Sequence, residues 1–224
     1  MKKIYSVLSV LVTILLPFIL IMGAIRILLN PFFLDYEYHL ANFPADPFGF
    51  TTADRLNYGK TSLNYLVNDQ GINFLADLKF PDGSSFYNER ELSHMLDVKN
   101  LIQASLKVWY IALAALLLLW FWSWRKHWSD KFWRGFSRGG FLTIGVIVAV
   151  ILGVFINFDA LFRGFHAIFF TGSTWLFYTN DSLIRLFPEK LWSDAFLFMG
   201  IFTLTGAIVS GFLGMHLSQR ETTV

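Results

Sequence analysis

The stretch IYSVLSVLVTILLPFILIMGAIRILL, residues 4–29, carries Arg26 as its one charged residue. A transmembrane helix needs about 20 mostly apolar residues, so this run is long enough to cross a bilayer. It could also pass for a signal peptide, but it is long, contains Pro17 and lacks a small-residue cleavage site. We therefore expect an uncleaved membrane span.

Three further apolar runs lie at 101–122, 141–157 and 193–215. Hydrophobic residues make up 55% of the 224 positions, and the mean hydropathy is +0.51. A soluble domain of this composition would expose too much apolar surface. The chain is therefore expected to be an all-α membrane protein, one membrane domain over 1–224 with four transmembrane helices. Gly206, Gly211 and Gly214 predict close helix packing in the last run.

Basic residues predict the orientation, because cytoplasmic segments are enriched in Lys and Arg. The connection 123–140 holds five basic residues against Asp130, whereas 31–100 holds ten acidic residues against five basic. Lys2 and Lys3 precede the first run, and Arg220 follows the last. Both termini and 123–140 are thus expected to face the cytoplasm, with segments 30–100 and 158–192 outside as a small, mostly helical extracytoplasmic cap. An aromatic belt at the inner interface is expected from Trp122, Trp124, Trp128, Phe132 and Trp133.

Within the expected cap, residues 52–66 and 88–100 are predicted to be helical. Asn88 and Glu91 have the spacing of a capping box. Residues 72–80 are predicted to be extended, and the Pro81-Asp82-Gly83 sequence predicts a turn. Gly172-Ser173-Thr174 is expected to be a turn between helices.

Several kinds of chemistry are disfavoured by the sequence. Cysteine is absent, which excludes thiol catalysis, disulfides and thiolate metal sites. There is no His-Glu-x-x-His, no Gly-x-Ser-x-Gly and no phosphate-binding glycine loop. The net charge of +2 is too small to suggest nucleic acid. We expect no metal, no cofactor and no nucleotide or nucleic-acid partner.

Two of the five histidines are candidates for proton transfer. His94 has Asp97 three residues later, where a carboxylate could orient the imidazole. His166 would lie on one face of a helix over 157–170 with Asp159 and Arg163, and Arg163 could stabilise an oxyanion. In the alternative interpretation, the charged groups only satisfy one another. His39 lies in a solvated acidic patch, and His127 and His216 are expected at the inner interface.

Two motifs resemble those of the lipoprotein intramolecular transacylases, small bacterial membrane enzymes with four spans. They are Glu91-Leu92-Ser93-His94-Met95-Leu96-Asp97-Val98-Lys99 and Asn157-x-Asp159-x-Leu161-Phe162-x-x-Phe165-His166-x-x-Phe169-Phe170. The resemblance covers essentially the whole chain. It implies transfer of the sn-2 acyl chain of a diacylglyceryl lipoprotein to the α-amino group of its own N-terminal cysteine, giving a lyso-form lipoprotein. It also implies a site in the bacterial cytoplasmic membrane, open to the extracytoplasmic side, in contact with phospholipid.

The same resemblance assigns the two essential histidines to His94 and His166. On this interpretation one imidazole, with His94 favoured, takes the proton of the attacking amine. The other steadies the tetrahedral intermediate or protonates the leaving glyceryl oxygen, and the assignment between the two stays open. The supporting positions expected from the sequence are Arg163, Asp97, Asp159, Asn157 and Lys99.

Two alternative functions remain open on the sequence. One is a metal- or serine-dependent membrane hydrolase that acts on lipid or peptide. The other is a non-enzymatic transporter accessory or sensor with a pH-responsive histidine pair.

Overall fold

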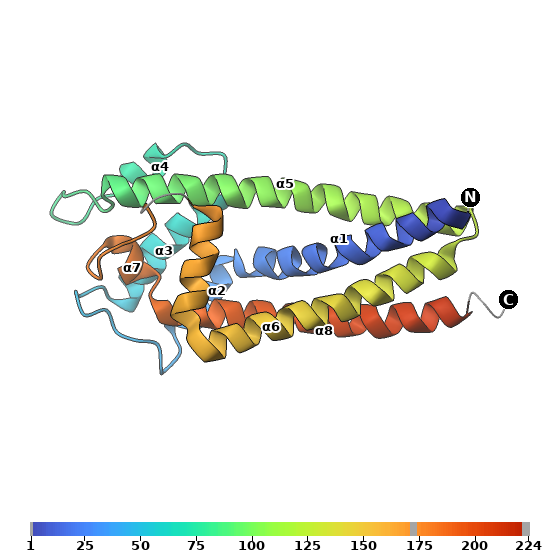
Figure 1. Cartoon of the computed structure of the whole chain (residues 1–224). Coiled ribbons are helices and arrows are strands. Elements are labelled where there is room, and N and C mark those ends of the chain that lie inside the picture. Colours follow the sequence, from blue (N-terminus) through green and yellow to red (C-terminus); the bar gives the residue numbers. More distant parts are fainter. Residues whose placement is uncertain (1, 171–173, 221–224) are drawn as a thin grey trace. The chain divides into compact units, whose positions relative to one another are not determined.

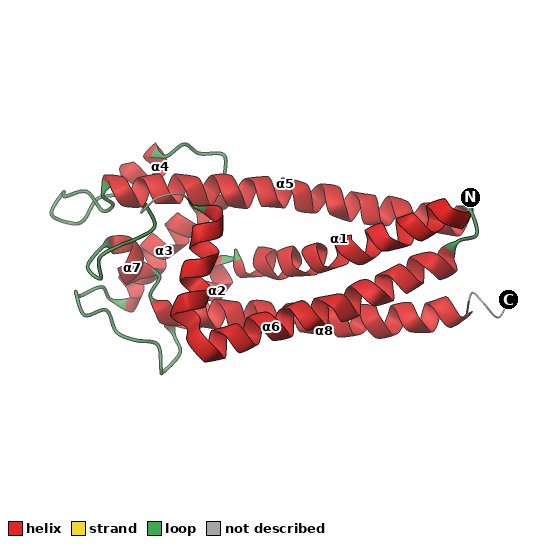
Figure 2. Ribbon diagram, viewed as in Figure 1, coloured by secondary structure: helices red, strands yellow, loops and turns green. Residues whose placement is uncertain are grey.

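Helices make up most of the chain. The computed structural model describes residues 2–170 and 174–220, and within them the chain forms eight helices (Figure 1, Figure 2). They are α1 (Lys2–Leu28), α2 (Pro31–Tyr38), α3 (Thr52–Val67), α4 (Asn73–Ala76), α5 (Glu89–Arg125), α6 (Ser129–Phe169), α7 (Ser182–Leu186) and α8 (Glu189–Arg220). The β-structure in this part of the chain is one isolated bridge between Lys79 and Ser85. The predicted all-α class is confirmed.

Four of these helices, α1, α5, α6 and α8, are long and apolar enough to cross a membrane. The predicted number of spans is therefore confirmed. The helices extend beyond the apolar runs, because α5 continues to Arg125 and α6 starts at Ser129. Most of segment 123–140 is consequently helical, and only the short turn around His127, with φ of 54°, interrupts it.

The chain divides into two compact units. The first unit comprises Met1–Ile27, Leu106–Phe155 and Phe196–Val224. Its helices approach closely at glycines. A Cβ built on Gly140 would come within 2.5 Å of the Gly211 nitrogen, and one on Gly214 within 2.7 Å of the Ser137 nitrogen. Ser137 also donates a hydrogen bond of 2.8 Å to the Gly211 carbonyl. The predicted close packing at Gly211 and Gly214 is confirmed.

The aromatic residues predicted to form an interfacial belt around segment 123–140 do not form a uniform one. Trp122 and Trp124 are exposed, as an interfacial role requires. Trp128 and Phe132 are each only 2% exposed and pack with Val12 and Leu119 in a hydrophobic cluster of the first unit. For these two residues the prediction of an interfacial belt was wrong, because the tight turn directs their rings inward.

The second unit comprises Leu28–Ser105 and Ile156–Ala195. Its core is formed by Tyr65, Leu75, Phe86, Tyr87, Met95, Leu183 and Leu186. The predicted helix over 52–66 corresponds to α3, and the predicted helix over 88–100 is the beginning of α5. The capping box is present, since Asn88 N–H donates to Glu91 and Glu91 N–H donates to Asn88.

The extended structure predicted over 72–80 was wrong. Residues Asn73–Ala76 form the short helix α4, which directs Leu75 into the core of the second unit. Only Lys79 pairs in the manner of a strand. The turn at Asp82 and Gly83 is confirmed, with Gly83 at a φ of 85°. Of the turn predicted at Gly172-Ser173-Thr174, Gly172 and Ser173 lie outside the described residues.

Candidate functional site

His94 lies near the start of α5, before the apolar part of that helix, and belongs to the second unit. Its side chain is 6% exposed, and its Nδ1 atom is buried without a hydrogen-bond partner. Its helix face buries Glu91, His94, Met95 and Lys99, a spacing of i, i+3, i+4 and i+8. Because an unpaired buried polar atom is costly, the buried Nδ1 of His94 marks this residue as a candidate functional group.

His166 belongs to the last part of α6, which is also in the second unit. This helix breaks at Asn157, whose φ of −162° and ψ of 89° are not helical. The Asn157 side chain accepts a hydrogen bond of 2.9 Å from Ala160 N–H, so Asn157 caps the helical segment that follows. That segment carries the imidazole of His166.

The hydrogen bond of His166 indicates its tautomer. Nδ1 lies 2.8 Å from the carbonyl oxygen of Phe162. A carbonyl only accepts, so Nδ1 carries the proton and a neutral ring has its lone pair on Nε2. His166 therefore presents a base, and the backbone of its own helix holds that base in place.

The two imidazoles lie close together. The ring centroids of His94 and His166 are 6.1 Å apart, and the ring planes are inclined by 24°. This arrangement brings together residues 72 positions apart in the sequence, as a shared role in one reaction requires. Two positive charges at this separation would repel one another, so the geometry favours at least one neutral ring.

Aromatic rings surround both histidines. The rings nearest to His166 are Phe162, at 4.1 Å between centroids, and Trp175, at 5.2 Å. Phe170 lies 5.0 Å from His94 and 5.5 Å from His166, and Phe177 lies 5.2 Å from His94. These rings exclude water from the imidazoles on several sides.

Burial keeps both imidazoles neutral. Desolvation, followed by the neighbouring His166, lowers the pKa of His94 to about 4. Desolvation also lowers the pKa of His166, although its hydrogen bond to the Phe162 carbonyl acts in the opposite direction. Both rings lie outside the apolar spans predicted at 101–122 and 141–157. At neutral pH each is therefore ready to accept a proton.

Asp159 and Arg163 pair with each other. Arg163 Nε donates to both carboxylate oxygens of Asp159 at 2.9 Å, and both side chains are largely exposed. Neither residue has a hydrogen bond to an imidazole within the described part of the chain. The helical spacing of Asp159 and Arg163 was predicted correctly. The structure does not bring the Arg163 guanidinium to the histidines. The alternative interpretation, in which the two charged groups only satisfy one another, describes this pair.

Asp97 and Lys99 also lie apart from the imidazoles. Asp97 is exposed, and His94 Nδ1 has no partner, so Asp97 does not orient the ring through that atom. Lys99 is 6% exposed and donates to Asn68 and to the Gln70 carbonyl. Its ammonium also lies 4.1 Å from the centre of the Tyr65 ring. Lys99 thus holds the loop after α3 rather than the reacting groups.

The sequence did not identify the residues that hold segment 177–183, which includes Phe177 and Tyr178, against α5. Asp181 accepts hydrogen bonds from Arg90 at 2.7 Å and from Asn88 at 3.0 Å. The Arg90 guanidinium also lies over the rings of Phe177 and Tyr178. Glu91 is 1% exposed and accepts the N–H of Leu183 at 2.7 Å. Of these, only the capping spacing of Glu91 was visible in the sequence.

A small apolar hollow lies beside His166. It has a volume of about 180 Å³ and shares Phe162 with the aromatic surroundings of that histidine. Its lining is Phe158, Asp159, Phe162, Ile184, Phe187, Glu189 and Trp192. Among the described residues, no group of three or more His, Asp or Glu side chains could hold a metal ion.

Comparison with known proteins places this geometry in context. Residues 10–192 match the model of the family described as lipoprotein intramolecular transacylase Lit. An uncharacterised protein of Aquifex aeolicus (strain VF5) is 27% identical over 215 residues, which are 94% of each chain. The solved structure of the membrane integral lipoprotein intramolecular transacylase Lit from Bacillus cereus is similar over 100% of both chains, with 21% identity and a TM-score of 0.84. A variant of that protein with one histidine replaced by alanine gives a TM-score of 0.77, over 100% of this chain and 97% of the other.

Proposed function

This chain belongs to the family of the lipoprotein intramolecular transacylases, and from that premise we propose that its reaction takes place at the pair of His94 and His166. The substrate is a diacylglyceryl lipoprotein. The sn-2 acyl chain leaves the glyceryl oxygen and joins the α-amino group of the N-terminal cysteine in the same molecule. The product is a lyso-form lipoprotein with an N-acylated cysteine.

One observation carries the proposal: the two imidazole rings lie 6.1 Å apart among aromatic rings. The attacking amine must be deprotonated, so the reaction needs a base. The departing glyceryl oxygen must gain a proton, so it also needs an acid. Two adjacent imidazoles can supply both, and the pair returns to its starting state after one proton passes through.

The tautomers favour different catalytic roles for the two rings. His166 holds its proton on Nδ1 and offers Nε2 as the base. His94 has no acceptor for a proton on Nδ1, which favours the tautomer with its proton on Nε2. In that tautomer Nε2 of His94 is a hydrogen-bond donor. We therefore propose that His166 takes the amine proton and then returns it to the leaving glyceryl oxygen, while His94 donates a hydrogen bond from Nε2 to the developing oxyanion. This reverses the assignment favoured from the sequence.

Positioning supplies much of the remaining acceleration in this proposal. Donor and acceptor belong to one molecule, and direct transfer closes a ring of about eight atoms through sulfur and glycerol. A site that holds this conformer removes part of the entropic barrier. Ester-to-amide transfer is downhill, so no nucleotide is required. The aromatic walls favour neutral groups and keep out water that would hydrolyse the ester instead.

The protein is a multi-pass membrane protein, and we propose an orientation for it. Both termini and the turn between α5 and α6 face the cytoplasm, because basic residues gather there. Spans at 4–29, 101–122, 141–157 and 193–215 then leave the second unit on the extracytoplasmic side, with His94 and His166 in it. Lipoproteins and phospholipids of the outer leaflet would reach the site from that side.

Mass spectrometry of a lipoprotein N-terminus tests the proposal. Cells that carry the unmodified protein should yield the N-acyl, lyso-glyceryl product. His94→Ala and His166→Ala should each reduce it by at least about a hundredfold, the usual contribution of a general acid or base. His39→Ala is the matched control, since His39 is exposed and bound to the Asp35 carbonyl. Undiminished product from either alanine variant would remove that histidine from the reaction.

A further inference from the structure

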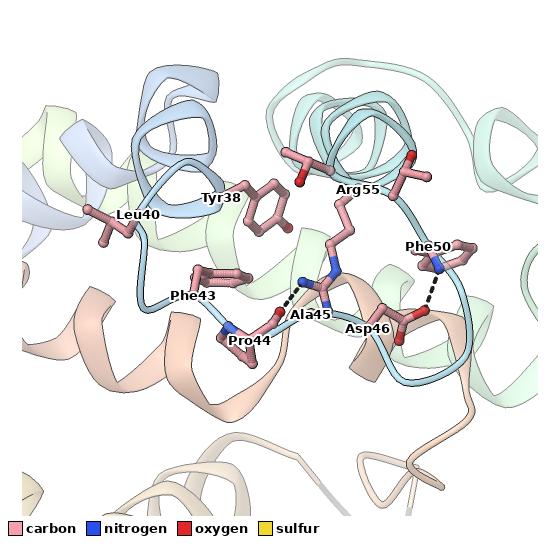
Figure 3. A pocket seen from close by; sticks show the side chains of 10 residues that line it. Tyr38, Leu40, Phe43, Pro44, Ala45, Asp46, Phe50 and Arg55 are labelled. Carbon is pink, nitrogen blue, oxygen red and sulfur yellow. Dashed lines mark hydrogen bonds between the residues drawn. The ribbon is translucent and has the colours of Figure 1, made fainter.

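A second cavity of the second unit lies among residues that the acyl-transfer proposal does not use. It has a volume of about 370 Å³, within the range of small-molecule sites. Figure 3 shows it between the loop after α2 and the beginning of α3. Its lining is Tyr38, Leu40, Phe43, Pro44, Ala45, Asp46, Phe50, Thr51, Thr52 and Arg55. The aromatic rings packed around His94 and His166 are not part of this lining.

Arg55 is the unusual member of this lining. Its side chain extends from α3 toward Pro44 and Asp46 (Figure 3), yet the residue is 5% exposed. One guanidinium nitrogen donates to the Pro44 carbonyl at 2.6 Å. Nε is buried without a hydrogen-bond partner, and Arg55 forms no ion pair within the described residues. A guanidinium has five N–H donors, so holding the Pro44 loop uses only a small part of its capacity.

The Asp46 carboxylate attracts the Arg55 guanidinium but forms its ion pair with Arg185 instead. Asp46 accepts from Arg185 at 2.9 Å and from Phe50 N–H at 2.7 Å, both through Oδ2, while Oδ1 is buried and unpaired. Although burial raises the pKa of Asp46, the Arg185 and Phe50 hydrogen bonds hold it below its usual value, so Asp46 is ionised. Two guanidinium groups thus face one carboxylate, which leaves one positive charge at the cavity wall. Buried charges are normally paired.

We propose that this cavity binds an oxyanion, a phosphate or carboxylate group, through the Arg55 guanidinium. The planar fork of arginine suits two oxygens of such a group. Phe43, 5.4 Å from the guanidinium carbon, and Leu40 provide an apolar wall for the part of the ligand next to the anion. The N-terminus of α3 is already capped by Thr51 and Asp54, so Arg55 rather than the helix end carries the recognition.

Two sources of this chemistry exist for a membrane protein. One is a small soluble anion, and the other is the phosphodiester of an anionic lipid headgroup. Both place the same oxyanion against Arg55. They differ in whether binding needs a bilayer, and the experiment separates them on that basis.

The experiment measures the thermal unfolding midpoint of the full-length protein. In detergent, inorganic phosphate is titrated against potassium chloride of equal ionic strength. In nanodiscs, phosphatidylglycerol is compared with phosphatidylcholine. We expect phosphate or phosphatidylglycerol to raise the midpoint of the unmodified protein. A rise with phosphate in detergent identifies a soluble anion as sufficient, whereas a rise confined to phosphatidylglycerol identifies the headgroup. No rise in either setting overturns the proposal.

Three variants locate the effect. Arg55→Met removes the charge and should weaken binding by about tenfold or more, the value of a hydrogen bond to a charged group. Ala45→Trp fills the cavity but keeps Arg55, so it should also lose the stabilisation by the anion. This variant tests the site if Arg55→Met does not fold. Lys60→Met is the control, because Lys60 lies on α3 and pairs with Asp35 outside the cavity. Equal stabilisation of all three variants would mean an adventitious ion effect only, and would refute the site.

Discussion

Burial controls the charge of His94, and this has a measurable consequence for stability. An unperturbed imidazole has a pKa of 6.5, and burial with the neighbouring His166 lowers that of folded His94 to about 4. Between these values the unfolded chain binds more protons than the folded chain. The stabilising contribution is therefore complete above about pH 6.5 and is lost as the pH falls toward 4.

His94→Gln tests this prediction, because glutamine stays neutral at every pH. The unmodified protein should lose about 1 to 2 kcal/mol of unfolding free energy relative to His94→Gln between neutral pH and about pH 5. Parallel denaturation curves for both proteins at the two pH values give the difference. A constant difference between the curves would show that His94 titrates normally in the folded protein.

Glu37 should produce a pH dependence of the opposite sign. Its side chain is 0% exposed, and burial, reinforced by the nearby Asp194 and opposed by Lys190, raises its pKa to about 7. The folded chain holds this proton more tightly than the unfolded chain. Its stabilising contribution is complete below about pH 4.5 and is lost as the pH rises through about 7.

The corresponding variant is Glu37→Gln, which mimics the protonated carboxyl. Its unfolding midpoint relative to the unmodified protein should be higher at about pH 8 than at about pH 5. Asp35→Asn on the same helix is the control, since Asp35 is only half-buried and pairs with Lys60. A Glu37→Gln difference that is the same at both pH values would contradict the raised pKa.

At the scale of the elements, the break in α6 determines where His166 lies. The Asn157 side chain accepts from Ala160 N–H and begins the helical segment that carries the imidazole. Asn157→Ala removes this cap at a cost of about 1 kcal/mol, and the frayed first turn should lower the rate of product formation by several-fold. Asn157→Asp keeps an acceptor and should restore the rate. Equal loss in both variants would show that capping is not what Asn157 contributes.

Some elements were predictable because their signals are local. The four long helices follow from apolar length, and the start of α5 follows from the Asn88 and Glu91 spacing. The prediction of extended structure at 72–80 failed because burial of Leu75 in the core overrides a weak local preference for strand. The two histidines were identified by their motifs, but their neighbours depend on helix rotation. Asp97 is three residues from His94 and still lies on the exposed face.

At the scale of the whole molecule, the proposed orientation leads to a prediction that the sequence makes easy to test. The chain has no cysteine, so one introduced thiol is the only one that can react. An even number of spans places both termini on one side, and in the proposed orientation that side is the cytoplasm, because the basic residues gather there. Asp69→Cys and Asn180→Cys, exposed positions in the two segments of the second unit, should react with a membrane-impermeant maleimide in intact cells.

Lys126→Cys completes the test from the opposite side. Lys126 is exposed in the turn between α5 and α6, so its thiol should react only after the membrane is permeabilised. The same pattern would place His94 and His166 outside, because Asp69 and Asn180 lie in the same compact unit as both imidazoles. Labelling of Lys126→Cys in intact cells, with protection of the other two, would invert the topology. It would then expose the histidine pair to the cytoplasm, where the lipids of the outer leaflet could not reach it.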